Sequence, residues 1–197
     1  MSAPFGDPYS AIVMDCPWNE PGGCGRGADD HYKTMDRYAI LETIIRSPYW
    51  RPADNCHNWM WSTMTSLVDS LWLMDTLGFD YKTHMVWVKS EGRIDLAGDL
   101  ALTIGLGQYF RGAHELVLFG TRGKGFAVRT EAMNIPSVMI APVPRGENGK
   151  RVHSRKPDRF YEIVNARSLG PKLEMFSRVA RPGFDGTGDQ YPEEVAS

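Results

Sequence analysis

The sequence predicts an α/β fold in which a largely parallel sheet is covered by helices. Two observations lead to this class. Short apolar runs rich in β-branched and aromatic residues alternate along the chain with segments of helical periodicity. Hydrophobicity within these runs is continuous rather than alternating, as expected for strands that are buried on both faces of a sheet.

The apolar runs have the lengths of strands, and we expect strands at 9–15, 58–62, 83–88, 115–119, 138–141 and 172–176. Three segments between them have one apolar face at helical spacing. The first can be capped by Asp36 and ends near Ser47-Pro48, where the proline disfavours a further turn. The second starts near Leu67 and ends at Gly78, and the third has Pro157 in its first turn.

Length and composition indicate one soluble domain spanning 1–197. The chain has 197 residues, of which 42% are hydrophobic and 23% charged, as in an ordinary globular protein. No apolar run is long enough to cross a bilayer, and the first residues lack the pattern of a secretory signal. We therefore expect a cytoplasmic protein, with its 3 cysteines reduced.

A basic segment stands out against a formal net charge of −2. Between 143 and 159 it includes Arg145, Lys150 and Arg151, with few carboxylates. Such a segment could follow nucleic-acid phosphates without strong non-specific binding. A solvated loop is the alternative that charge alone leaves open.

The end of the first expected strand carries the most informative residues, Asp15-Cys16-Pro17-Trp18. In α/β sheets, ligands bind beyond the carboxyl ends of the strands. A carboxylate and a carbonyl held in one turn suit the activation of an amine such as that of adenine, which is a poor nucleophile because its lone pair is delocalised into the ring. The Asp15 carboxylate and the Cys16 carbonyl can accept hydrogen bonds from its two N–H groups and so favour a more tetrahedral nitrogen. Trp18 offers a face on which a base can stack.

This interpretation has structural and metal-binding alternatives. Asp15 could cap a turn while Trp18 packs in the core. A zinc site would have to combine Cys16, Cys24, Cys56, His31 and His57, but no two of them have the spacing of a CxxC pair. We expect no metal.

Further motifs follow the turn in a recognisable order. They read HYKTM at 31–35, NWMWST at 58–63, GFDYKTHMVWVK at 78–89, GLGQYFRGAHELVLFGTRG at 105–123, HSRKPDRFYEIV at 153–164 and GPKLEMFSR at 170–178. In this order the sequence resembles the adenine-N(6) methyltransferases of the MT-A-seventy type, typified by the catalytic subunit of the eukaryotic mRNA adenosine methyltransferase. The resemblance covers nearly the whole chain.

The resemblance implies a Rossmann-like methyltransferase fold that uses S-adenosylmethionine, with the catalytic turn early and the donor-binding strand late. It implies a catalytic role for Asp15, Cys16, Pro17 and Trp18. It assigns donor binding to Asp15, Lys156, Glu174, Phe176, Arg178, Asp189 and Gln190. Positions that match the entry for the target adenosine are Trp18, His31, Tyr32, Lys89 and Glu115, and we add Arg145, Lys150 and Arg151 as phosphate contacts.

Departures from the family pattern keep a second interpretation open. Cys16 replaces the usual first proline and should act through its backbone carbonyl. Asp189 replaces an asparagine, and a carboxylate can accept from ribose hydroxyls but cannot donate. The alternative is a catalytically silent nucleic-acid-binding or scaffold subunit. Methylation of a protein amide is disfavoured, because such enzymes usually have asparagine at the position of Asp15.

The expected substrate is a nucleic acid from which the adenine is unstacked or flipped. The short chain has no appended RNA-binding domain, which favours DNA over RNA and a bacterial or phage-type enzyme. We expect loops at 19–32, 120–136 and 143–153 to close over the target. A homodimer or a partner subunit is possible for so small a domain.

Overall fold

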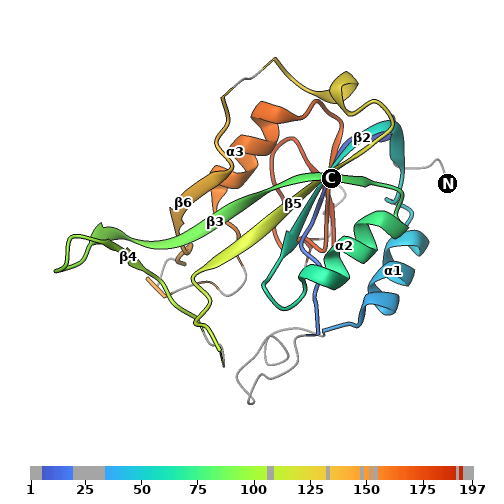
Figure 1. Ribbon diagram of the computed structural model, residues 1–197. Coiled ribbons are helices and arrows are strands. Elements are labelled where there is room, and N and C mark those ends of the chain that lie inside the picture. Colours follow the sequence, from blue (N-terminus) through green and yellow to red (C-terminus); the bar gives the residue numbers. More distant parts are fainter. Residues whose placement is uncertain are drawn as a thin grey trace.

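The computed structural model describes residues 6–19, 34–105, 109–131, 134–146, 149–150, 152, 155–189 and 191–192. Within these ranges the strands form an 8-stranded sheet in the order β4-β3-β5-β2-β1-β7-β8, and β6 pairs with β3 (Figure 1). The strands are β1 (Tyr9–Met14), β2 (Pro52–Ser62), β3 (Asp80–Ile94), β4 (Leu100–Leu102), β5 (His114–Arg122), β6 (Val138–Pro142), β7 (Lys172–Met175) and β8 (Asp185–Thr187). The predicted α/β class is confirmed.

Strand direction divides the sheet into two parts. β1 pairs in parallel with β2 and β7, and β7 pairs in parallel with β8. β5 runs antiparallel to both β2 and β3, and β4 runs antiparallel to β3. Consequently, β3 points in the same direction as β1, whereas β5 begins at the edge where β1 ends.

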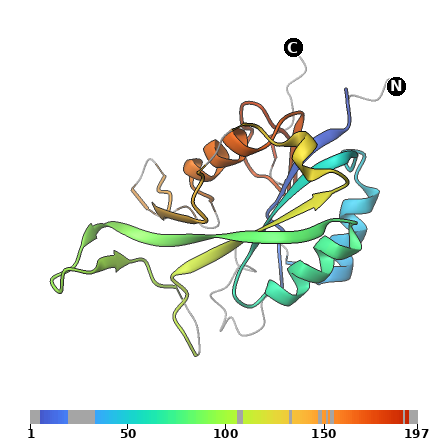
Figure 2. The ribbon, with the colours of Figure 1, turned by 45° about the horizontal axis from the view of Figure 1, so that its top comes forward.

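Helices cover both faces of the sheet (Figure 2). α1 (Arg37–Arg46) and α2 (Leu67–Thr76) lie on one face, and α3 (Asp158–Arg167) lies on the other; a short 3-10 helix, Gly125–Val128, follows β5. The Asp36 carboxylate caps α1 by accepting hydrogen bonds from the N–H groups of Tyr38 and Ala39. None of the helices in the described ranges is long and apolar enough to span a membrane.

The two cores follow the alternation of side chains along the strands. On β1, Ile12 and Met14 pack toward α1 and α2, whereas Val13 packs toward α3. The α3 side is rich in aromatic side chains. Phe160 is fully buried, and its ring meets Trp59 and Trp61 in edge-to-face contacts at 6.2 and 4.7 Å between centroids.

The sequence underestimates the lengths of β2 and β3 and gives no sign of β4 or β8. At the β4 edge of the sheet, the end of β3 and the whole of β4 form a projecting hairpin, here called the arm (Glu91–Leu102; Figures 1 and 2). The Asp95 carboxylate closes its turn by accepting from the N–H groups of Ala97 and Asp99. The apolar side chains Ile94 and Leu96 in the arm are exposed.

Truncating Phe160 should test the core on the α3 side. We expect Phe160→Ala to lower the free energy of unfolding by about 3–5 kcal/mol, because it removes a buried ring and leaves a cavity. The matched control is Phe126→Ala, since Phe126 is 80% exposed; there we expect a change within about 0.5 kcal/mol. Urea denaturation followed by tryptophan fluorescence measures both. Equal losses for the two variants would contradict this description of the core.

Candidate active site

The site lies between β1 and β7, where the direction of the chain through the sheet changes. From β1 the chain continues to β2 on one side, and from β7 it continues to β8 on the other. Such a switch point leaves a crevice at the carboxyl ends of the strands. A cavity of about 260 Å³ opens there. Its lining residues are Asp15, Pro17, Met35, Thr43, Ser47, Met175, Phe176, Ser177, Arg178, Thr187, Gly188 and Asp189.

The turn at the end of β1 is held in place by backbone hydrogen bonds. The Asp15 N–H donates to the Met175 carbonyl at 3.4 Å, which ties the turn to β7. The Trp18 N–H donates to the Cys16 carbonyl at 2.9 Å, and the Met35 N–H donates to the Pro17 carbonyl at 2.8 Å. The turn is therefore fastened to β7 and to the residue that leads into α1.

Four charged side chains form a continuous series beside this turn, which we call the ion chain: Lys89, Glu115, Lys156 and Asp15. Lys156 Nζ lies 3.0 Å from Asp15 Oδ1 and 2.9 Å from Glu115 Oε2. Lys89 Nζ lies 2.6 Å from Glu115 Oε1. The Lys156 and Glu115 side chains are only 8% and 13% exposed, so the pairing is largely shielded from water.

The sheet explains why residues so far apart in sequence meet here. Asp15 follows β1, Lys89 lies in the second half of β3, and Glu115 lies at the start of β5. These three positions fall at one edge because β5 is antiparallel to its neighbours. Lys156 arrives from the segment before α3, and its ammonium also lies 4.8 Å from the centroid of the Trp61 ring.

Burial and charge shift the titration of the ion chain. Burial alone would raise the pKa of Glu115, but Lys156 and Lys89 outweigh it and hold that pKa at about 2. Burial raises the pKa of Asp15 above its ordinary value; Lys156 opposes this rise and Glu115 adds to it. Burial disfavours the charged form of Lys156, yet the two carboxylates raise its pKa. At neutral pH, Lys156 and Glu115 are therefore both charged.

Cys16 and Trp18 are mostly buried, at 6% and 7% exposure. Burial and the Asp15 carboxylate raise the pKa of the Cys16 thiol well above its ordinary value, so the thiol stays neutral. The Cys16 carbonyl already accepts one hydrogen bond and has a second lone pair. Trp18 belongs to the core under α1 and α2. Stacking of a base on Trp18 stays a prediction.

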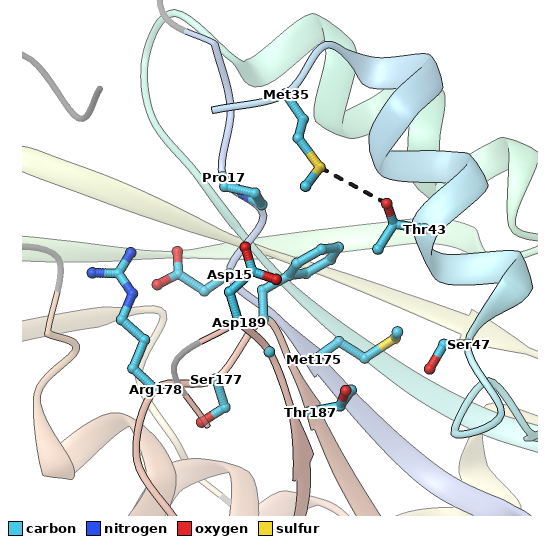
Figure 3. A pocket seen from close by; sticks show the side chains of 12 residues that line it. Asp15, Pro17, Met35, Thr43, Ser47, Met175, Ser177, Arg178, Thr187 and Asp189 are labelled. Carbon is cyan, nitrogen blue, oxygen red and sulfur yellow. Dashed lines mark hydrogen bonds between the residues drawn. The ribbon is translucent and has the colours of Figure 1, made fainter. Parts of the chain in front are cut away.

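Phe176, Arg178 and Asp189 all reach the cavity from the loops that follow β7 and β8. Across it lie Thr43 on α1 and Ser47 directly after this helix (Figure 3). Phe176 has a φ of 60°, a left-handed conformation that is costly for a side chain with a Cβ and is concentrated at functional sites.

Glu174, predicted beside the donor, points instead toward α3. Its carboxylate accepts a hydrogen bond from the Tyr161 hydroxyl and lies 3.4 Å from Arg181 Nε. The Arg181 guanidinium stacks on the Tyr161 ring at 3.7 Å from the centroid. Glu174 is not among the residues that line the cavity. A direct donor contact by Glu174 stays a prediction, whereas its contacts with α3 are evident.

The predicted phosphate contacts Arg145 and Lys150 are exposed on a turn beyond β6. Arg145 Nη1 donates to the Gly149 carbonyl at 2.8 Å, and the Gly146 N–H donates to the Lys150 carbonyl at 2.9 Å. Of the other predicted residues, His31, Tyr32, Arg151 and Gln190 lie outside the described ranges. Within those ranges, no group of three His, Cys, Asp or Glu side chains gathers in a metal-binding arrangement.

Sequence reasoning missed several cavity residues. Thr43 and Ser47 lie four positions apart, one helical turn, so they share a face at the end of α1. The Thr43 hydroxyl contacts Met35 Sδ at 3.8 Å (Figure 3). Two hydroxyl side chains one helical turn apart, on the side of α1 that faces the cavity, were the available signal for these residues. Ser177 and Thr187 had none, because each is a single hydroxyl in a short segment.

Together, the switch-point cavity and the acidic turn at a strand end indicate a Rossmann-like methyltransferase fold, in which the turn precedes β7, the strand that borders the cavity. Comparison with known families agrees with this class. The sequence matches the MT-A70 family over residues 9–190, so the protein belongs to the MT-A70 methyltransferase family.

One characterised relative is the Type II methyltransferase M.MunI of Mycoplasma sp, which is 28% identical to this chain over 146 residues. The alignment covers 72% of this chain and 53% of that protein. The chain thus spans about half the length of the curated relative it matches.

Removing the central cation should expose the energetic role of the ion chain. We expect Lys156→Met to lower the free energy of unfolding at pH 7 by about 3–5 kcal/mol, because two shielded carboxylates lose their shared partner. The folded pKa of Glu115 then rises and that of Asp15 rises further above its ordinary value, so the deficit should shrink as the pH falls toward 4. Urea denaturation at several pH values measures this.

The control for that experiment is Arg46→Met, which breaks the i,i+4 pair with Glu42. Those two side chains are 76% and 57% exposed, so little loss is expected. A Lys156→Met deficit that matched the control, or that grew as the pH fell, would contradict the assignment of Lys156 as the shared counter-ion.

Proposed function

We propose that this protein transfers a methyl group from S-adenosylmethionine to the N6 amine of adenine in a nucleic acid, with DNA preferred over RNA. The observation that carries the proposal is the position of Asp15. Its carboxylate lies at the end of β1, lines the cavity and is held by Lys156 at 3.0 Å. Membership of the MT-A70 family supports methyl transfer as the reaction class.

The cavity has features that suit S-adenosylmethionine, which supplies an electrophilic methyl group on a sulfonium. Met35, Met175 and Phe176 offer apolar surface for the adenosyl group. Asp189 follows β8, and a carboxylate after the second strand of a Rossmann-like unit commonly accepts hydrogen bonds from ribose hydroxyls. The replacement of asparagine by Asp189 is thus compatible with donor binding.

Arg178 is the cavity cation suited to the donor carboxylate. Sequence reasoning gave Lys156 this role, but the Lys156 ammonium lies between Asp15 and Glu115. We propose that Lys156 acts mainly on Asp15, by setting the orientation of the carboxylate and favouring its ionised form.

In the proposed reaction, the Asp15 carboxylate and the Cys16 carbonyl accept hydrogen bonds from the two N–H groups of the adenine amine. The nitrogen lone pair is then directed at the methyl carbon. The N–C bond forms as the S–C bond breaks, sulfur retains the electron pair of that bond, and one N6 proton leaves to water. Alignment of nitrogen, carbon and sulfur supplies much of the acceleration. The Cys16 thiol is not needed, in keeping with its raised pKa.

A labelled-methyl assay on single- and double-stranded DNA and RNA, followed by digestion to nucleosides, tests the proposal. We expect label in N6-methyladenosine, as the deoxynucleoside if DNA is the substrate. Asp15→Asn should reduce the rate by at least about 100-fold, because it replaces a charged acceptor with a neutral amide. Asp75→Asn is the control, since Asp75 is an exposed carboxylate on α2.

Calorimetric titration with S-adenosylmethionine separates the proposal from its alternative. An active enzyme binds the donor. Nucleic-acid binding without donor binding would instead identify a catalytically silent subunit and would refute the proposed activity. An Asp15→Asn protein that kept full activity would refute the assigned role of the turn.

A further inference from the structure

Two adjacent aromatic side chains, Tyr109 and Phe110, stand in the solvent between β4 and β5. They are 93% and 81% exposed. Single exposed apolar residues are common in proteins, but two neighbouring aromatic rings with so little cover indicate a surface that contacts something else. Arg111 follows directly and is also exposed. We call Tyr109, Phe110 and Arg111 the aromatic finger.

The finger is attached to the strands that carry the ion chain. The Gly105 N–H donates to the Gly112 carbonyl at 2.7 Å, which brings the two sides of its base together. The Lys89 N–H donates to the Ala113 carbonyl at 2.8 Å, and the Thr103 N–H donates to the Lys89 carbonyl at 2.7 Å. Lys89 and Glu115 form the outer pair of the ion chain. The base of the finger therefore adjoins the catalytic edge, and Figure 1 shows this segment reaching beyond the strand ends.

The charge around the finger suits a polyanion. The sequence from Thr103 to His114 contains Arg111 and no carboxylate. The exposed Arg145 and Lys150 follow β6, whose last residue pairs with Ser90 on β3. The arm differs, because it carries three carboxylates, Glu91, Asp95 and Asp99, against the single cation Arg93, beside aliphatic side chains. Nucleic acid is thus a better occupant for the finger than for the arm.

We propose that Tyr109 and Phe110 are a stacking surface for the bases that flank the target adenine, and that Arg111 contacts an adjacent phosphate. This inference rests on the nucleic-acid part of the proposed function. An adenine that leaves its stack exposes the faces of its neighbours. Aromatic side chains bind such faces with little dependence on sequence. The finger thereby holds the strand while the adenine amine reaches Asp15.

Fluorescence anisotropy with a labelled single-stranded oligonucleotide tests the inference without requiring activity. The variant is Tyr109→Ala combined with Phe110→Ala. We expect its Kd for the oligonucleotide to rise about 10-fold or more, whereas its calorimetric Kd for S-adenosylmethionine stays the same. In the methylation assay, KM for the nucleic acid should rise far more than kcat falls.

Two matched controls define the effect. Tyr109→Phe combined with Phe110→Tyr keeps two aromatic faces and should bind within about 2-fold of the unmodified protein, because stacking needs only the rings. Phe126→Ala removes another ring that is 80% exposed, beyond the opposite end of β5. It should leave oligonucleotide binding unchanged.

Each remaining outcome overturns a specific statement. If the double alanine variant binds the oligonucleotide as the unmodified protein does, the stacking inference is wrong. If it changes the oligomeric state in light scattering while nucleic-acid affinity is kept, the rings belong to a protein interface. If the unmodified protein binds the oligonucleotide without methylating it, the proposed activity fails while the stacking inference remains open to this test. If it neither binds nor methylates, both fail.

Discussion

The site depends on the pairing of the Lys156 ammonium with two carboxylates. The ammonium stands between Asp15 and Glu115 at 3.0 and 2.9 Å, in a region with little water. Two carboxylates this close would repel each other, and one would take up a proton. With Lys156 between them and Lys89 on the far side of Glu115, the ion chain has two positive and two negative groups. The Asp15 carboxylate can then remain an ionised acceptor in a fixed orientation.

The antiparallel strand β5 makes this arrangement possible. In a wholly parallel sheet, only the ends of strands meet at the ligand-binding edge. Because β5 runs the other way, its first residues, including Glu115, lie at the edge where β1 ends, and Lys156 links Glu115 to Asp15. The same edge then continues into Lys89 and the base of the aromatic finger. The switch-point cavity, the turn after β1 and the proposed substrate contact thus lie one after another along the same edge.

Much of the fold could be predicted, because local signals agreed with tertiary structure. Asp36 caps α1, and Ser47 ends it before Pro48. The positive φ of 79° at Gly78 explains why α2 ends beside a glycine. β4 and β8 were missed because strands of 3 residues leave no periodic pattern. The direction of β5 was also hidden, since an apolar run buried on both faces looks alike in either direction.

The sequence predicted which residues belong to the candidate site, but not which of their side chains contact one another. Resemblance to the family selected Asp15, Lys156 and Glu115, but no spacing indicated that the three side chains pair with one another. Lys156 was expected at the donor and Glu174 beside it. The structure places the Lys156 ammonium on Asp15, and it joins Glu174 to Tyr161 and Arg181. Such contacts depend on how distant elements meet, which a single sequence does not encode locally.

The most direct test of the central claim is the pH dependence of kcat/KM for methyl transfer, compared between the unmodified protein and Glu115→Gln. Because Glu115 raises the pKa of Asp15, removing its charge should lower that pKa. The acid limb of kcat/KM, which reports groups of the free enzyme, should then move to lower pH. An acid limb that stays in place or moves to higher pH would contradict the account, since Glu115 and Lys156 would not control the ionisation of Asp15.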